Sequence, residues 1–187
     1  MPVRSITRWY LEMTGPEQLA PGPPPQPGFE VRHAAEPSPE FARFLYTAVG
    51  GDWFWVDRLH WDWSRWRAHV ERPAIETWVG WLHGTPAGYG ELARQGDAVL
   101  LAYFGLLPGF MGRGLGPLLL HAVVSRAWET GPRRVHLSTC SLDAPAALRT
   151  YERAGFRVFQ ERIERVPLPD VSPGPWPGAG RPTAVRA

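Results

Sequence analysis

Three glycines alternate at the point where a predicted loop becomes a predicted helix. In the stretch "GFMGRGLGPLLL", Gly112, Gly114 and Gly116 are followed by apolar residues at helical spacing. Glycine tolerates a left-handed backbone and lets main-chain N–H groups approach a ligand closely. The unpaired N–H groups of the first turn of a helix form a natural site for an anion. The stretch therefore predicts a loop and helix that bind a phosphate or another anion.

Two common phosphate-binding loops do not fit this stretch. A Walker loop needs a Gly-Lys-Ser/Thr sequence, and all 20 Lys and Arg positions of the chain are Arg. A dinucleotide-binding fold needs Gly-x-Gly-x-x-Gly, usually after its first strand. Here the spacing is Gly-x-Gly-x-Gly, and the loop follows most of the predicted strands. The absence of lysine also excludes Schiff-base catalysis.

The composition is that of a folded chain. Its 187 residues, 44% apolar and 12% aromatic, suit one domain with a sizeable core. A net charge of only +2 and scattered basic residues argue against nucleic acid as a partner. Cys140 is alone, so no intramolecular disulfide can form, and no Cys/His spacing is typical of a metal site. We therefore expect no metal cofactor.

Neither a leader nor a membrane span is expected. The N-terminal residues lack the apolar core of a signal peptide, and the longest apolar run, 98–107, is too short to span a bilayer. We expect a cytoplasmic protein without a membrane partner.

The chain divides into three parts by composition. Residues 1–27 read as an N-terminal extension that ends in a proline-rich connector, and its segment 5–13 is expected to form an edge strand or to lie across the surface. Residues 28–166 carry alternating strand and helix patterns and form the predicted domain. Residues 167–187, rich in Pro and Gly, predict a flexible or draped tail.

Hydrophobic periodicity gives the order of elements within the predicted domain. Strands are expected at 29–34, 74–82, 87–94, 98–107, 133–140 and 157–166, and helices at 38–49, at 64–72, from Leu115 onwards and within 143–156, with Asp143 as the cap of the last. This order predicts an α/β fold with a central, mixed sheet of six to seven strands, flanked on both faces by about four helices.

Two stretches resemble motifs of one enzyme family. The glycine stretch is similar to the acyl-coenzyme A pyrophosphate loop of the GNAT N-acetyltransferases, Arg/Gln-x-x-Gly-x-Gly/Ala, with Met111 in the Arg/Gln position and Gly114 and Gly116 in the glycine positions. Downstream, "LDAPAALRTYERAGF" resembles the second motif of that family, with Tyr151 four residues before a Gly-Phe pair. The resemblance covers residues 28–166 and implies the GNAT fold, in which the central mixed sheet is mostly antiparallel.

The resemblance also implies a reaction. Members of this family usually transfer the acetyl group of acetyl-coenzyme A directly to an amine in a ternary complex. The coenzyme-binding positions that it implies are Leu106, Leu107, Met111, Gly112, Arg113, Gly114, Leu115, Gly116, Ala144, Leu148, Tyr151 and Arg153.

Four positions depart from the family pattern. Met111 replaces the basic or amide side chain of the loop, and Pro117 removes one backbone donor. Ala144 stands where many relatives carry Asn or His. Leu100 stands where some members carry a glutamate base. These departures leave the predicted fold intact and leave the proton pathway open.

Acetyl transfer needs a proton for the leaving thiolate and hydrogen bonds for the carbonyl oxygen. Tyr151 is the candidate general acid, by resemblance and by its place on the face of its helix that is expected to point toward the sheet. The alternative is a tyrosine that only packs in the core. Backbone N–H groups near Leu106 and Leu107 are expected to stabilise the oxygen.

The general base is left open. Glu91 is the nearest acidic candidate on a strand, although a strand glutamate is more often a solvated surface residue. A water chain to backbone carbonyls, or to Ser138 and His136, is an equal alternative. Cys140 is a further candidate as a nucleophile, but a free cysteine is more often simply buried.

A tryptophan-rich segment between the first two predicted helices suggests the acceptor site. Tyr46, Trp53, Trp55, Asp52 and Asp57 offer aromatic faces and carboxylates, which suit a small protonated amine. The competing interpretation places these aromatic residues in the core.

Two further functions remain open beside the acetyltransferase. One is a non-catalytic acyl-coenzyme A-binding or sensor module that has lost its base. The other is an interaction protein, suggested by the proline-rich ends and the ten tryptophans. The expected partners are acetyl-coenzyme A and an amine, and a homodimer is left open.

Overall fold

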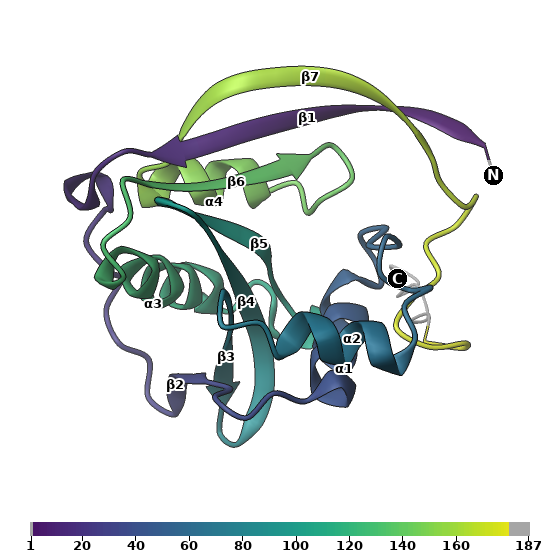
Figure 1. Cartoon of the computed structure of the whole chain (residues 1–187), viewed down its shortest axis with the longest axis horizontal. Coiled ribbons are helices and arrows are strands. Elements are labelled where there is room, and N and C mark those ends of the chain that lie inside the picture. Colours follow the sequence, from purple (N-terminus) through teal and green to yellow (C-terminus); the bar gives the residue numbers. More distant parts are fainter. Residues whose placement is uncertain (1, 180–187) are drawn as a thin grey trace, which may run out of the picture.

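A seven-stranded sheet forms the centre of the computed structural model, which describes residues 2–179 (Figure 1). The strands are β1 (Val3–Met13), β2 (Phe29–His33), β3 (Ile75–Leu82), β4 (Thr85–Gln95), β5 (Ala98–Leu106), β6 (Arg134–Cys140) and β7 (Arg157–Pro167). They lie in the order β2-β3-β4-β5-β6-β1-β7. Only the neighbours β5 and β6 are parallel. The predicted mixed, mostly antiparallel sheet is confirmed.

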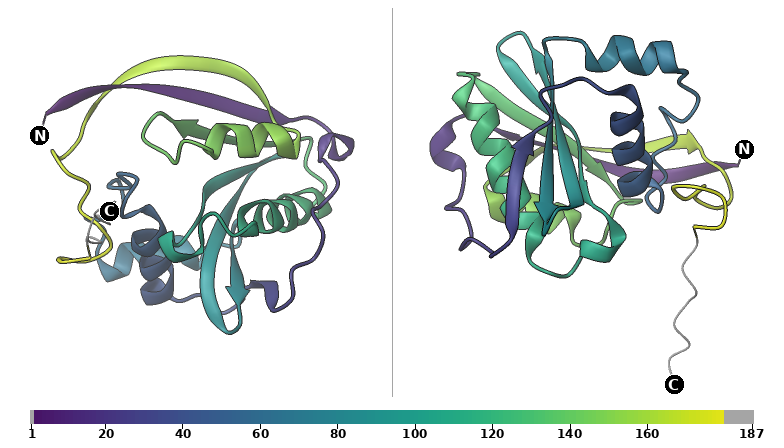
Figure 2. Two further views of the ribbon diagram at one scale, coloured as in Figure 1. Left: turned by 180° about the vertical axis from the view of Figure 1, so that it is seen from behind. Right: turned by 90° about the horizontal axis from the view of Figure 1, so that it is seen from below.

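Helices cover both faces of this sheet. Four α-helices are present in the described part of the chain: α1 (Pro39–Gly50), α2 (Trp63–Val70), α3 (Leu115–Glu129) and α4 (Ala147–Ala154). Two short 3-10 helices are also present: η1 (Pro16–Gln18) follows β1, and η2 (Pro108–Phe110) follows β5. Helices α1 and α2 lie on one face, and α3 and α4 lie on the other (Figure 2, right). Within residues 2–179, no helix is both long and apolar enough to cross a membrane.

Local chemistry explains where these helices begin and end. The Ser38 side chain accepts a hydrogen bond from the Phe41 N–H at 3.1 Å and caps α1. Asp62 caps α2 in the same way. Helix α4 ends at Gly155, whose φ of 108° suits glycine. The inner face of α3 is fully buried, and its packing against the sheet forms the main core.

Strand β1 lies inside the sheet. It pairs antiparallel with β6 on one side and with β7 on the other, and Leu11 and Met13 are fully buried. Neither predicted placement of residues 5–13, at an edge or across the surface, is right. Strand β1 takes an inner position because both of its backbone edges are paired and its apolar residues pack in the core between the sheet and helices α3 and α4. The sheet thus continues into the predicted N-terminal extension.

The start of the predicted tail drapes over the loop that follows α1. Strand β7 runs to Pro167, and Leu168 is buried. The Ser172 hydroxyl donates to the Gly51 carbonyl at 2.5 Å and accepts from the Phe54 N–H at 3.2 Å. The rest of the tail, 180–187, lies outside the described residues.

Candidate active site

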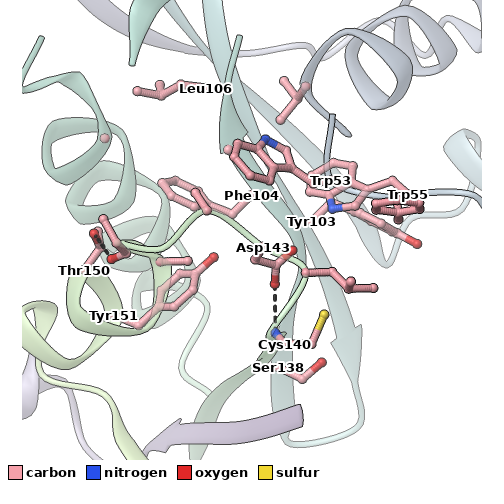
Figure 3. Close-up of a pocket in the computed structure, with 18 of the residues that line it drawn as sticks. Trp53, Trp55, Tyr103, Phe104, Leu106, Ser138, Cys140, Asp143, Thr150 and Tyr151 are labelled. Carbon is pink, nitrogen blue, oxygen red and sulfur yellow. Dashed lines mark hydrogen bonds between the residues drawn. The ribbon is translucent and has the colours of Figure 1, made fainter. Parts of the chain in front are cut away.

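The parallel strands β5 and β6 pair only at their beginnings. Their register runs from Ala98 opposite Arg134 to Leu100 opposite His136, and beyond it the strands diverge. A cavity of about 740 Å³ opens between the diverging ends (Figure 3). Because the later residues of β5 lack a partner on this side, their N–H and C=O groups are free to pair with an extended ligand.

The predicted glycine loop forms one end of the cavity. Gly112 and Gly114 have φ values of 73° and 77°, a region that L side chains rarely adopt. A Cβ at either position would meet nothing within 4 Å, so the space before the loop is open. Helix α3 begins next, and no side chain caps its first turn. Its unpaired N–H groups and its dipole favour an anion here.

The structure brings together some of the predicted coenzyme positions and not others. Leu106, Met111, Gly112, Gly114, Gly116, Ala144 and Tyr151 line the cavity, and Leu107, Arg113, Leu115, Leu148 and Arg153 do not. Leu115 is fully buried in the core beneath the loop. Arg113 is exposed and lies over the Phe110 ring at 5.4 Å, and Arg153 is also exposed.

Tyr151 of α4 lines the cavity. Its side chain is only 8% exposed, and its hydroxyl points into the cavity (Figure 3). The ring packs edge-to-face against Phe104 and Phe156. Burial raises the pKa of Tyr151 well above its usual value, and the nearby Asp143 adds to the rise. The hydroxyl therefore stays protonated at neutral pH, as a proton donor must.

Asp143 is a cavity residue that the sequence analysis assigned to another role. It was expected to cap the last helix, but α4 begins at Ala147, too far along the chain for that contact. Its carboxylate instead accepts hydrogen bonds from the Thr139 hydroxyl at 2.6 Å and from the Cys140 N–H at 2.9 Å. These bonds hold it between β6 and Tyr151.

Aromatic residues and a second carboxylate form the opposite end of the cavity. Trp53, Trp55 and Asp57 line it, as does Tyr103 from β5 (Figure 3). Tyr46 does not line the cavity, but its hydroxyl donates to Asp57 at 2.6 Å, and the Tyr103 hydroxyl donates to the other carboxylate oxygen. Sequence reasoning missed Tyr103 because it reads as one more residue of an apolar strand.

Comparison with known proteins identifies the family. Residues 38–156, more than half of the chain, match the family described as "Acetyltransferase (GNAT) family". The chain belongs to the GNAT acetyltransferases. The predicted family and fold are thereby confirmed.

The chain is similar to two curated proteins, both named Lysine N-acyltransferase MbtK, from two strains of Mycobacterium tuberculosis. Each is 31% identical over 103 residues, which cover 42% of this chain and 49% of the relative. The chain therefore spans about half the length of the curated relatives that it matches.

Solved structures show the same fold. A GCN5-related N-acetyltransferase from Sphaerobacter thermophilus aligns with a TM-score of 0.67 and 23% identity, over 92% of this chain and 55% of the other. A GCN5-related N-acetyltransferase from Kribbella flavida aligns with a TM-score of 0.63 and 20% identity, over 87% and 59%.

The predicted base of this GNAT chain, Glu91, is part of a buried ion pair. Both of its oxygens lie 2.9 Å from Arg58 nitrogens, and His69 Nε2 lies 3.2 Å from Oε1. Glu91 is 3% exposed, so it is not a solvated strand residue, and it does not line the cavity. Burial alone would raise the pKa of Glu91, but His69 and Arg58 outweigh it and hold the pKa below its usual range. This placement disfavours Glu91 as a base.

The remaining catalytic candidates also find defined places. The Leu107 N–H donates to the Ala87 carbonyl at 2.9 Å, so it is not free to stabilise an oxyanion, contrary to expectation. Ser138 and Cys140 line the cavity, and His136 does not. Burial, with a smaller effect of Asp143, raises the pKa of the Cys140 thiol, which disfavours a nucleophilic role.

Within residues 2–179, no group of three or more His, Cys, Asp or Glu side chains is placed to hold an ion.

Proposed function

We propose that this chain transfers the acetyl group of acetyl-coenzyme A to a small amine. The observation that carries the proposal is the cavity between β5 and β6. The uncapped start of α3 lies at one end of it, and an aromatic wall with a carboxylate lies at the other. A cosubstrate with a diphosphate fits the first end, and a cationic amine fits the second.

The first end supplies binding and an acid. The open space before Gly112 and Gly114 accepts the diphosphate, and the free backbone of β5 pairs with the peptide-like arm of the coenzyme. This arm would place the thioester near the Tyr151 hydroxyl. The neutral amine attacks the thioester carbon and forms the C–N bond. As the C–S bond breaks, Tyr151 donates its proton to the sulfur, and the proton that the amine loses returns through water to Tyr151. Tyr151 thus acts at the step in which the coenzyme leaves.

The second end supplies the acceptor site. Asp57 and Asp143 are the carboxylates that line the cavity, and only Asp57 lies beside the aromatic wall. Tyr46 and Tyr103 fix the Asp57 carboxylate, which pairs with the ammonium form of the acceptor on entry. Trp53 and Trp55 contact the body of the acceptor through their rings. The curated relatives are named lysine N-acyltransferases, which is consistent with an alkylamine.

An amine panel tests this function. With acetyl-coenzyme A present, small alkylamines and arylalkylamines should release free coenzyme thiol faster than histone-like peptides do. Asp57→Asn should raise the KM for the preferred amine by roughly tenfold to a hundredfold, because it removes a charged partner. Asp52→Asn is the matched control, since Asp52 is exposed in the same segment and does not line the cavity. Preference for peptides, or an unchanged KM in Asp57→Asn, would contradict the assignment.

One observation favours a second function. Leu100 and Ala144 lack the polar groups that relatives use, and Glu91 is held by Arg58 rather than facing the cavity. A chain that kept the loop and lost its base would bind acyl-coenzyme A as a sensor. Calorimetric binding of acetyl-coenzyme A with no thiol release for any amine would support this function. The predicted cytoplasmic location stays a prediction.

A further inference from the structure

Strand β7 is a long, exposed edge of the sheet. It pairs with β1 on one side, and no strand within residues 2–179 pairs with its other side (Figure 1). The strand has 11 residues, and Ile163 and Phe159 on it are 76% and 46% exposed. An edge of this length presents a row of unpaired N–H and C=O groups to any strand that matches it.

The charges along β7 are complementary to those of a second, antiparallel copy of the same strand. The sequence Glu161-Arg162-Ile163-Glu164-Arg165 has opposite signs at equal distances from Ile163. When two copies run antiparallel with Ile163 facing Ile163, Arg162 lies opposite Glu164 of the other copy, and Glu161 lies opposite Arg165. We propose that two copies of this chain pair along β7 in this register and form a twofold-symmetric dimer with a continuous sheet.

Neighbouring registers are disfavoured by the same charges. A shift that centres the pairing on Arg162 or on Glu164 places identical charges face to face. The two half-step shifts would oppose residues that point to opposite faces of their own strand, so the twofold axis excludes them. Charged side chains on edge strands usually prevent pairing. On β7 the charges disfavour the neighbouring registers and attract each other in the register centred on Ile163.

The side chains involved are held in place by β1. The Trp9 indole donates to the Glu161 carboxylate at 2.9 Å, and Arg8 lies 2.9 Å from Glu164. These contacts order the two carboxylates on the sheet before a second copy arrives, which lowers the entropy lost on association. Ile163, which is mostly exposed in one copy, becomes covered by its counterpart across the axis.

The mass of the full chain in solution tests the proposal. Sedimentation velocity over a wide concentration range should give a species of twice the chain mass of 21.0 kDa. In the Glu161→Arg variant, a positive charge faces Arg165 of the other copy at two symmetric positions. The dimer Kd should therefore rise by roughly tenfold or more. Glu161→Arg combined with Arg165→Glu restores opposite charges and should recover the parental Kd. Ile163→Asp places two carboxylates on the axis and should also dissociate the dimer.

Asp97→Arg is the matched control, because Asp97 lies in the exposed turn between β4 and β5. It makes the same change of charge and should leave the Kd unaltered. Circular dichroism establishes that each variant is folded. The proposal is overturned if the parent is a monomer at every concentration, or if folded Glu161→Arg and Ile163→Asp keep the parental dimer. It is equally overturned if the double exchange fails to recover pairing.

Discussion

Arg58 links the buried centre of the molecule to the wall of the cavity. Its guanidinium pairs with both oxygens of Glu91 and lies 4.3 Å from the centroid of the Tyr103 ring. Tyr103 in turn donates its hydroxyl hydrogen to Asp57. Arg58 does not line the cavity, but it fixes the Tyr103 ring. Through that ring it also fixes the Asp57 carboxylate, which does line the cavity. Glu91 serves this arrangement by neutralising Arg58.

Removal of the Glu91 charge is expected to cost stability. Glu91→Gln leaves the Arg58 charge buried without its partner, which should lower the free energy of unfolding by about 3–5 kcal/mol at neutral pH. The folded state lowers the pKa of Glu91 below its value in the unfolded chain, which is about 4.3. The contribution of the Glu91 charge to stability is therefore complete above the unfolded pKa, and it is lost as the pH falls through the pKa of the folded state. Urea denaturation of parent and variant at several pH values measures the difference, which should shrink in acid.

Glu71→Gln is the control for this prediction. Glu71 pairs with Arg67 on the exposed surface of α2, and its loss should change stability by less than about 1 kcal/mol. A Glu91→Gln variant that is as stable as the parent but turns over much more slowly would instead restore Glu91 as the candidate base.

Tyr151 is expected to matter for turnover and not for coenzyme binding. Tyr151→Phe keeps the ring and its packing against Phe104, so affinity for acetyl-coenzyme A should be unchanged by calorimetry. Turnover should fall by about 10²–10⁴-fold, the usual contribution of a general acid. Because the Tyr151 pKa is raised, the acid should remain protonated in moderately alkaline assays. Tyr89→Phe, a buried tyrosine outside the cavity, is the control, and equal turnover in both variants would show that Tyr151 only packs.

At the scale of elements, the start of α3 carries the binding prediction. Gly114→Val introduces a branched side chain where φ is 77° and fills the space before the helix, so the Kd for acetyl-coenzyme A should rise at least tenfold. Gly131→Val is a matched control, because Gly131 has a φ of 71°, equally open space, and a position at the far end of α3. Calorimetry on both folded variants decides the question. Equal affinity for acetyl-coenzyme A in both variants would show that the diphosphate does not bind at this loop.

The strands on either side of the cavity differ in what supports them. Strand β5 is paired along its length with β4, and its bulge leaves Ala102 without a partner there. Strand β6 is paired with β1, not with β5, along the part that lines the cavity. The opening is therefore a consequence of strand pairing, because each wall is held by its outer neighbour.

On the scale of the whole molecule, both ends of the chain complete the site. Ile6 and Arg8 of β1 line the cavity, as do Val166 and Leu168 near the C-terminal side of the described chain. Strand β1 pairs with β6 and β7, so these two segments lie side by side as the last two strands of the sheet (Figure 1). The cavity wall thus includes residues from the beginning and from near the end of the described chain.

The sequence by itself determined the local features of this protein. The spacing of Gly112 and Gly114 predicted a left-handed loop before a helix, and period-two and helical patterns predicted the elements from 28 to 166, because these depend on neighbours within a few residues. The tertiary structure alone decided the position of β1, the Arg58–Glu91 pair and the two tyrosines on Asp57. Each of these depends on which distant segments meet, and a hydrogen bond or ion pair leaves no periodic trace in the sequence that would reveal its partner.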